Sequence, residues 1–175
     1  MVLTHLAAEL GLTFKTHKAH ASVAEGRTRP GGPKVILAKP ASFMNLSGKP
    51  TAALVTFFDV PAERVIVVHD ELDIPFDDVR IKFGGGHGGH NGVRDIVSAL
   101  GTQEVVRLRV GIGRPPGRQD AADFVLSDFA RSEREVLPHL LAEASDAIVA
   151  IVEHGYLAAQ QSVNAPDTDG TGGAV

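Results

Sequence analysis

The chain has 175 residues, a length that suits one domain with a buried core. It contains no cysteine, which excludes disulfides, thiolate zinc sites and a cysteine nucleophile and fits a reducing, cytoplasmic location. No apolar run approaches the roughly 18 residues that a membrane-spanning helix needs, so we expect none. The start of the chain has no basic leader and soon turns polar, unlike a signal peptide.

Charge is distributed unevenly along the chain, whose formal net charge is −4. Residues 1–40 carry six Lys and Arg against two Asp and Glu, residues 41–118 carry nine of each, and residues 119–175 carry two against ten. We therefore expect a polyanionic partner to contact the first two thirds of the chain. The same distribution also fits a protein with a basic face, an acidic face and no charged partner.

Helical and strand-like patterns alternate along the sequence. In chain order they predict a helix over 2–10, strands over 19–24 and 35–38, a helix over 52–58, strands over 65–68 and 79–83, a helix over 93–100, a strand over 105–113 and a long helix over 132–151. The strand over 65–68 is fully apolar, which is typical of a sheet covered on both faces. We therefore expect an α/β single domain, a twisted mixed β-sheet with helices on both faces.

Two local signals define the C-terminal part of the fold. Ser132, followed three residues later by Glu135, predicts a capping box at the start of the last long helix. The polar, glycine-rich segment near the C-terminus offers nothing to bury. We therefore expect the domain to span residues 1–157 and residues 158–175 to form a disordered tail.

The most unusual segment is a glycine-rich loop that follows a predicted strand and opens a predicted helix. Five of the six residues from 84 to 89 are glycine, so another group can approach the bare backbone closely. Gly84, Gly86 and Gly89 match the spacing of dinucleotide-binding loops, which makes a dinucleotide-binding enzyme one alternative. A mobile connection without a ligand is another, although histidines and an asparagine are unusual in a mere linker.

Histidines near this loop raise the question of a metal site. His69, Asp70, His87 and His90 carry the imidazole and carboxylate groups that suit zinc or iron. The two loop histidines lack the helical spacing that usually presents such ligands, so we expect no metal. For His69, beside a strand end, a hydrogen-bonded structural imidazole is the preferred interpretation.

The remaining polar groups suit the attack of water on an ester. No Gly-x-Ser-x-Gly motif is present, so a serine nucleophile is poorly supported. Asp70 stands at a strand end, where an aspartate can orient a histidine and stabilise its imidazolium. Asn45 and Asn91 lie in loops that open helices, and their amides can donate to a carbonyl oxygen that gains charge. Each asparagine is equally well explained as a helix cap.

Four motifs follow one another along the chain, with Asp123-Phe-Val-Leu after them: Phe43-Met-Asn-Leu-Ser-Gly-Lys, Val68-His-Asp-Glu-Leu-Asp, Lys82-Phe-Gly-Gly-Gly-His-Gly-Gly-His-Asn-Gly and Arg107-Leu-Arg-Val-Gly-Ile-Gly-Arg-Pro. In order and spacing they are similar to the signature segments of bacterial peptidyl-tRNA hydrolases. The resemblance runs from residue 2 to about residue 157, and four motifs in order are far more specific than any one of them.

This resemblance implies an enzyme that cleaves the ester joining a peptide to tRNA and so recycles the tRNA. It also implies a monomer without a metal or a cofactor. Asp70 matches the aspartate that holds the catalytic histidine in its basic form. Asn45 and Asn91 match the asparagines that hold the substrate and the attacking water.

The resemblance also implies how the tRNA is held. Phe43 matches a position that lines the tRNA acceptor end. Lys82 and Arg109 match basic residues that grip the 5′-phosphate of the tRNA. Peptidyl-tRNA is thus the expected partner, contacted at its acceptor stem and 3′ end.

The sequence departs from the family at its start. Members begin with a strand, a Gly-Asn-Pro-Gly turn, a tyrosine and a Thr-Arg-His-Asn motif whose histidine is the general base, whereas this sequence begins at the helix that follows. His5 lies on that helix and matches no catalytic position. We therefore expect the chain as printed to lack the general base, so that Asp70 has no imidazole to orient, and to lack one strand of the sheet. A tRNA-binding protein without activity is thus a further alternative.

Overall fold

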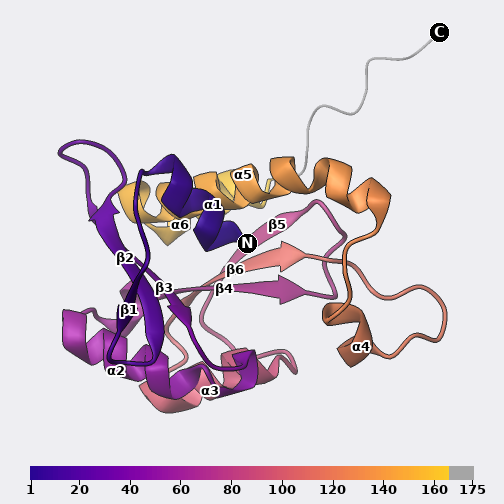
Figure 1. Cartoon of the computed structure of the whole chain (residues 1–175), viewed down its shortest axis with the longest axis horizontal. Coiled ribbons are helices and arrows are strands. Elements are labelled where there is room, and N and C mark those ends of the chain that lie inside the picture. The colour runs from indigo at the N-terminus through magenta and orange to yellow at the C-terminus, as the bar shows by residue number, and fades with distance from the viewer. Residues whose placement is uncertain (166–175) are drawn as a thin grey trace, which may run out of the picture.

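Six strands divide into two sheets in the computed structural model, which describes residues 1–165 (Figure 1). The first sheet is antiparallel and consists of β1 (Lys15–His17), β2 (Ala21–Arg27) and β3 (Lys34–Pro40), in that order. Only the second and third of these strands were predicted, because β1 is short and polar. The class of fold, α/β, is confirmed, although its strands form two sheets rather than one.

The second sheet is mixed and has the order β4-β6-β5. The central strand β6 (Val106–Gly111) runs parallel to β4 (Ile66–Glu71) and antiparallel to β5 (Val79–Phe83). Hydrophobic residues alternate with polar ones along β6, and the hydrophobic row, with Val106 and Leu108, is buried. The polar row of β6 lies on the opposite face of this sheet, where the polar groups of the candidate site gather.

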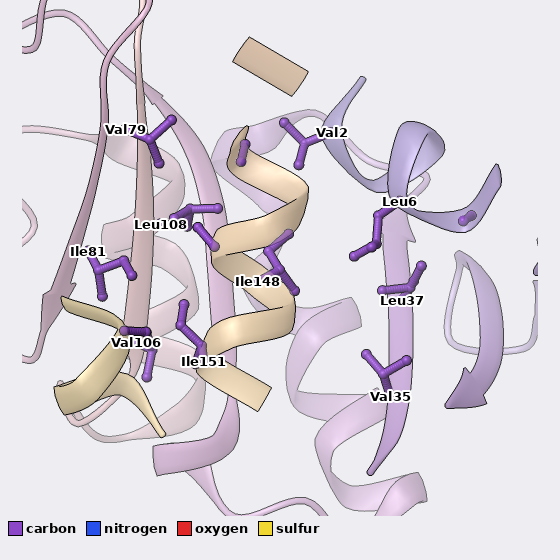
Figure 2. Packing of buried hydrophobic residues seen from close by; sticks show 14 of the residues in the cluster. Val2, Leu6, Val35, Leu37, Val79, Ile81, Val106, Leu108, Ile148 and Ile151 are labelled. Atoms are coloured by element: carbon purple, nitrogen blue, oxygen red, sulfur yellow. The ribbon is translucent and has the colours of Figure 1, made fainter. Parts of the chain in front are cut away.

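Helices cover both faces of the mixed sheet, as predicted. On one side lie α1 (Val2–Glu9), α5 (Arg131–His154) and α6 (Tyr156–Val163) (Figure 1). The main core forms between them and the strands, and it also includes side chains of β3 (Figure 2). Its central members are almost fully buried: Leu6, Val79, Ile81, Leu108, Leu140 and Ile148. No helix within residues 1–165 combines the length and hydrophobicity needed to cross a membrane.

The opposite face of the mixed sheet carries a smaller core. Val67 of β4 packs there with Val93 and Ile96 of α3 (Asn91–Leu100). Gly101 ends α3 in the left-handed conformation with φ of 70°, as its position in the sequence predicts. The helix α2 (Gly48–Phe58) packs beside α3. These two helices therefore lie on the side of the sheet that carries the polar row of β6.

Short helices complete the fold in three connections. The 3-10 helix η1 (Met44–Leu46) precedes α2, and η2 (Ala62–Arg64) precedes β4. The helix α4 (Ala121–Val125) lies between β6 and α5, with Asp120 capping it by accepting the Ala122 N–H over 2.8 Å. Of the three, only η1 forms part of the candidate site.

The last long helix begins one residue earlier than predicted. Its cap position is Ala130, two residues before the predicted Ser132. α5 begins at Arg131, and the Ala130 N–H donates to Glu133 Oε2 over 2.7 Å. Glu133, rather than Glu135, therefore reaches back to the helix start. Ser132 lies inside the first turn, and Ala130 has no side-chain oxygen to complete the reciprocal half of the box.

The predicted boundary at residue 157 is also wrong. Residues 158–163 continue α6, and its C-terminal end satisfies the outer edge of β5. The Asn164 side chain accepts the Ile81 N–H over 2.8 Å and donates to the Ile81 carbonyl over 2.9 Å. Gln160 donates to the same carbonyl over 2.9 Å. A strand edge is thereby covered, which sequence periodicity did not indicate. The rest of the predicted tail, residues 166–175, lies outside the described residues.

Candidate active site

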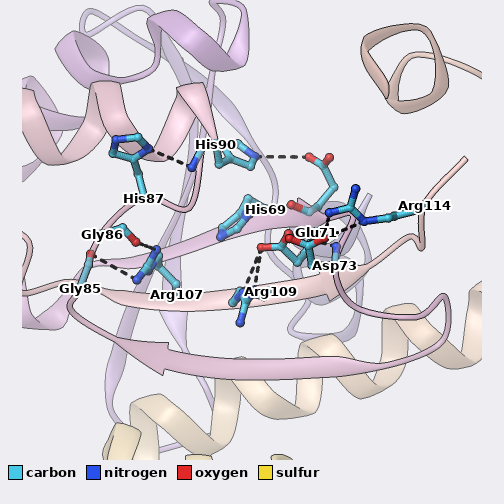
Figure 3. Close-up of polar contacts among 12 residues, drawn as sticks. His69, Glu71, Asp73, Gly85, Gly86, His87, His90, Arg107, Arg109 and Arg114 are labelled. Carbon is cyan, nitrogen blue, oxygen red and sulfur yellow. Dashed lines mark hydrogen bonds and ion pairs between the residues drawn. The ribbon is translucent and has the colours of Figure 1, made fainter. Parts of the chain in front are cut away.

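The site lies at the end of β4, on the polar face of the mixed sheet. Residues that pair in register have side chains on the same face, so His69 of β4 lies beside Arg109 of β6. Glu71 lies two residues after His69 on β4, and Arg107 lies two residues before Arg109 on β6, so both extend the same row. Figure 3 shows this row of polar side chains with the glycine-rich loop next to it.

Asp70 faces an imidazole, contrary to the expectation that it has none to orient. Its Oδ1 lies 3.7 Å from His90 Nε2, and this contact with His90 lowers the pKa of Asp70 below its usual range. The other ring nitrogen of His90, Nδ1, accepts the Val93 N–H over 3.2 Å and so caps α3. Because an accepting nitrogen carries no hydrogen, neutral His90 has its proton on Nε2, directed at Asp70.

His69 is buried, with 6% of its surface exposed. Its Nδ1 donates to the Asp70 carbonyl over 2.7 Å, while Nε2 has no hydrogen-bond partner in the part of the chain that the structure describes. Burial lowers the pKa of His69 to about 4, so the ring is neutral near pH 7. Its ring packs edge-on against His90, with centroids 4.5 Å apart. The expectation that His69 is a hydrogen-bonded imidazole is confirmed for its Nδ1.

Both candidate asparagines present free amides. Asn45 lies in η1 and Asn91 is the first residue of α3, and both side chains are exposed. Neither amide forms a hydrogen bond with any of residues 1–165. The alternative that Asn91 caps α3 is wrong, because His90 occupies the cap position and accepts the Val93 N–H. The cap alternative also fails for Asn45, since Ser47 precedes α2.

The packing of η1 on α3 brings the two asparagines into one region. Gly92 has no side chain, and a Cβ there would lie 2.4 Å from Met44 Cγ and 2.9 Å from the Met44 carbonyl oxygen. The Gly48 N–H donates to Asp95 Oδ2 over 2.6 Å, which fixes the start of α2 to α3. Two glycines and one carboxylate thus hold the segment that carries Asn45 against the helix that begins with Asn91.

The basic residues of the site differ in how free they are. Lys82 is exposed and forms no ion pair with any described residue, whereas Arg109 contacts Glu71 Oε2 through Nη2 at 3.0 Å and through Nε at 3.1 Å. Lys82 pairs in register with Arg107, so it lies on the same face of the sheet as Arg109. Phe43, next to η1, is 81% exposed. The structure therefore leaves one cation free and one neutralised.

Sequence reasoning assigned three site residues no function. The sequence indicated His90 as part of the glycine-rich loop and as a metal ligand, while Glu71 and Arg107 entered only through the motifs and strand pattern that contain them. Strand periodicity alone places Glu71 with His69 and Arg107 with Arg109, and would have indicated a shared polar face. Nothing in the sequence indicated that His90 would cap α3.

Among residues 1–165, ligand-type atoms converge in a different place from the predicted histidines. Asp77, His139 and Glu143 bring carboxylate and imidazole atoms within 4.8 Å of one another. They belong to α5 and the turn before β5, not to the segments that carry Asn45, Asp70 and Asn91. His139 Nδ1 lies 3.7 Å from Asp77 Oδ1, an ion pair that links α5 to this turn when the histidine is protonated.

An aspartate and two unbonded amides beside one sheet suit a hydrolase that uses water rather than a serine or cysteine nucleophile. The chain matches the family model of peptidyl-tRNA hydrolase over residues 1–170. The peptidyl-tRNA hydrolase of Arthrobacter sp. (strain FB24) is 58% identical over 161 residues, which cover 92% of this chain and 83% of the relative. That of Kineococcus radiotolerans is 52% identical over 171 residues, which cover 95% and 86%.

Solved structures agree with these relatives. The crystal structure of peptidyl-tRNA hydrolase from Acinetobacter baumannii has a TM-score of 0.84 and 32% identity, and the match covers 94% of this chain and 83% of that one. The chain belongs to the peptidyl-tRNA hydrolase family, whose members are carboxylic ester hydrolases.

The comparisons support neither alternative, the tRNA-binding protein without activity or the dinucleotide-binding enzyme. The geometry of the glycine-rich loop also differs from that of a dinucleotide site. Such a site presents backbone N–H groups to a pyrophosphate. Here the carbonyls of Gly84, Gly85 and Gly86 converge on Arg107.

Proposed function

We propose that this site binds the 3′ end of peptidyl-tRNA and hydrolyses the ester that joins the peptide to the terminal ribose. The observation that supports this most strongly is the place of Asn91 directly after His90, which contacts Asp70, with η1 and its Asn45 packed on the same helix. Water attacks the ester carbonyl carbon and the bond to the ribose oxygen breaks. One proton of the water ends on that oxygen, and the other is released to solvent. The products are a peptide carboxylate and a tRNA with a free 3′ end.

The two asparagines serve the carbonyl and the water in this proposal. The Asn91 amide donates to the oxygen that gains charge in the transition state and orients the attacking water. The Asn45 amide holds the peptide end of the substrate. Both amides are free to do so, because they have no hydrogen bonds with residues 1–165. A preorganised donor of this kind typically contributes about 10²–10³ in rate.

Asp70 is proposed to stabilise positive charge on an imidazole during proton transfer. Within residues 1–165, the imidazole at its carboxylate is that of His90. His90 can accept a proton only at Nδ1, and that nitrogen is engaged by the Val93 N–H. We therefore assign His90 to capping and to the contact with Asp70, and we assign no imidazole among residues 1–165 to the proton transfer that Asp70 would support.

The chain is proposed to act as a monomer in the cytoplasm and to contact the tRNA with the basic side of the site. Lys82 and Arg109 take the 5′-phosphate at the end of the acceptor stem. Phe43 offers an exposed ring on which a base at the acceptor end can stack, an interaction worth about 1–3 kcal/mol. The charge distribution of the sequence supports this side, since the excess of acidic residues follows residue 118.

The experiment that tests this function measures peptide release and tRNA binding separately. The purified 175-residue chain is incubated with an N-blocked aminoacyl-tRNA, and Asp70→Asn serves as the matched variant. Because no imidazole among residues 1–165 is assigned the role of general base, we expect only slow hydrolysis by the wild-type chain, a lower kcat in the variant and unchanged tRNA affinity. Binding without hydrolysis by the wild-type chain would instead identify a tRNA-binding protein without activity. Absence of both would contradict the proposal.

A further inference from the structure

Arg107 is a buried arginine whose charge is satisfied by backbone rather than by a carboxylate. The residue is 4% exposed and forms no ion pair with the residues that the structure describes. Burial and the neighbouring Arg109 lower the pKa of Arg107 from its usual value. Burying a cation without an ionic partner is unfavourable unless its N–H groups are satisfied. The groups that accept these N–H bonds therefore define what the guanidinium does in the fold.

The guanidinium holds three successive carbonyls of the glycine-rich loop. Nη1 donates to the Gly86 carbonyl over 2.8 Å, and Nη2 donates to that of Gly85 over 3.4 Å (Figure 3). Nη2 also donates to the Gly84 carbonyl. Gly84 and Gly85 have φ of 63° and 76°, a conformation that glycine adopts without strain. These backbone angles turn consecutive carbonyls toward one point, and the planar fork of an arginine matches them.

The loop leads directly to the groups proposed for catalysis. Four residues after Gly86 comes His90, which caps α3 and faces Asp70, and Asn91 follows it. Between Gly86 and His90, the two residues Gly88 and Gly89 have open space where a Cβ would be. Among residues 1–165, the hydrogen bonds of this second half of the loop are local ones around His87, from the Gly89 N–H to His87 Nδ1 at 3.1 Å and from the His90 N–H to the His87 carbonyl at 3.0 Å. Arg107 joins the first half of the loop to the sheet through three carbonyls, next to the bond from the Gly84 N–H to the Val105 carbonyl at 3.1 Å.

We infer that Arg107 is a positioning residue that fixes the glycine-rich loop and, through it, the placement of His90 and Asn91 against Asp70. This inference rests on the proposed function for its catalytic consequence. The placement itself is a property of the folded chain. Lysine does not replace arginine here, because a single ammonium cannot present a planar fork to three consecutive carbonyls. Arg107 does not touch the substrate, so its loss affects turnover more than substrate binding.

The test compares Arg107→Ala, Arg107→Lys and the wild-type chain in two independent measurements. Hydrogen exchange of the segment 84–93 reports the loop whether or not the chain is active. We expect exchange there to quicken by about tenfold or more in both variants, with protection of the β4-β6-β5 core retained. Steady-state kinetics with the blocked aminoacyl-tRNA should show kcat reduced by about 10²-fold and KM changed less than about threefold. Guanidinium ion at a concentration well below its denaturing range should restore part of kcat in Arg107→Ala.

Arg80→Ala is the control, since Arg80 is an arginine on the adjacent strand whose guanidinium contacts Asp78 and the Asn164 carbonyl instead of the loop. It should leave loop exchange unchanged and should show no rescue by guanidinium. Unchanged exchange over 84–93 in Arg107→Ala would overturn the inference. So would a uniform rise in exchange over the whole chain, because Arg107 would then serve only global stability. A wild-type chain without hydrolysis would contradict the proposed function but leave the exchange result to decide this one.

Discussion

Asp95 on α3 accepts a hydrogen bond from the backbone N–H of Gly48, the first residue of α2, over 2.6 Å. A carboxylate at a helix N-terminus satisfies one of the free N–H groups there and interacts favourably with the helix dipole. Ser47, at the cap position, makes no side-chain bond of this kind. Asp95 therefore caps α2 from another helix. The segment that carries Asn45 comes directly before α2 and packs on α3, so this bond fixes its position as well.

Replacing Asp95 should loosen this connection. We expect Asp95→Ala to lower the free energy of unfolding by about 1–2 kcal/mol, as for the loss of a helix cap, because the Gly48 N–H loses its acceptor. Asp95→Asn keeps an oxygen acceptor and should lose less. Urea unfolding of the two variants and the wild type measures the difference. Equal stability of Asp95→Ala and wild type would mean that water replaces the carboxylate without loss.

Contacts of this kind, between residues far apart in the chain, are the part of the site that could not be predicted from the sequence. The glycine-rich loop, the strand that ends at Asp70 and the helix that begins after the loop were all predicted, because each has a local signal in periodicity or glycine content. The Asp95–Gly48 bond, the grip of Arg107 on the loop and the Asp70–His90 pair join residues far apart in sequence. No spacing rule encodes them, since they depend on how helices and strands pack. The α/β class follows from local patterns, whereas the contacts that shape the site follow from tertiary structure.

Asn91 should matter for the reaction and not for the fold. Its side chain forms no hydrogen bond with residues 1–165, while the neighbouring His90 caps α3. We expect Asn91→Ala to lower kcat by about 10²–10³ with a melting temperature close to that of the wild type. His90→Ala is the matched comparison and should lower the melting temperature through loss of the cap. A fall in melting temperature without a fall in rate for Asn91→Ala would remove this residue from the site.

Lys82 and Arg109 should contribute unequally to tRNA binding. Among the described residues Lys82 has no ionic partner, whereas Arg109 is neutralised by Glu71 at 3.0 Å. Removing one phosphate-binding cation should reduce the dependence of log affinity on log salt by about 1, and we expect this in full for Lys82→Ala and less for Arg109→Ala. Glu71→Gln releases the guanidinium and should strengthen binding. Affinities measured between about 50 and 200 mM salt, a range in which such effects are large, decide this.

A larger loss of salt dependence in Arg109→Ala than in Lys82→Ala would point to a different phosphate site. An unchanged salt dependence in both alanine variants would mean that neither cation reaches the phosphate. Weaker binding by Glu71→Gln would mean that Glu71 holds Arg109 in its binding position rather than competing for it. Lys18→Ala is a useful control, because Lys18 lies over the ring of Phe57, at 5.0 Å from its centroid, away from the mixed sheet.

His69 should make the fold sensitive to acid. Burial lowers its pKa from 6.5 to about 4, so the folded chain keeps His69 neutral at pH values where the unfolded chain protonates it. A group whose pKa is depressed in the fold contributes stability above its unfolded pKa and loses it as pH falls. We therefore expect the free energy of unfolding to decline by about 3 kcal/mol between pH 6.5 and 4 from this residue alone. Asp70, whose pKa is also lowered, adds a loss in the same direction at the acid end.

His69→Asn tests this assignment, because an asparagine amide can still donate to the Asp70 carbonyl but does not titrate. The substitution in a buried position should reduce stability at pH 7, so the informative quantity is the change with pH, not the absolute value. We expect the decline between pH 6.5 and 4 to be shallower in His69→Asn than in the wild type, and Asp70→Asn to retain most of it. Urea unfolding over this pH range provides the measurement. Parallel curves for His69→Asn and wild type would mean that the folded chain protonates His69 as readily as the unfolded chain does, and that its unpartnered Nε2 is open to solvent or to a proton donor.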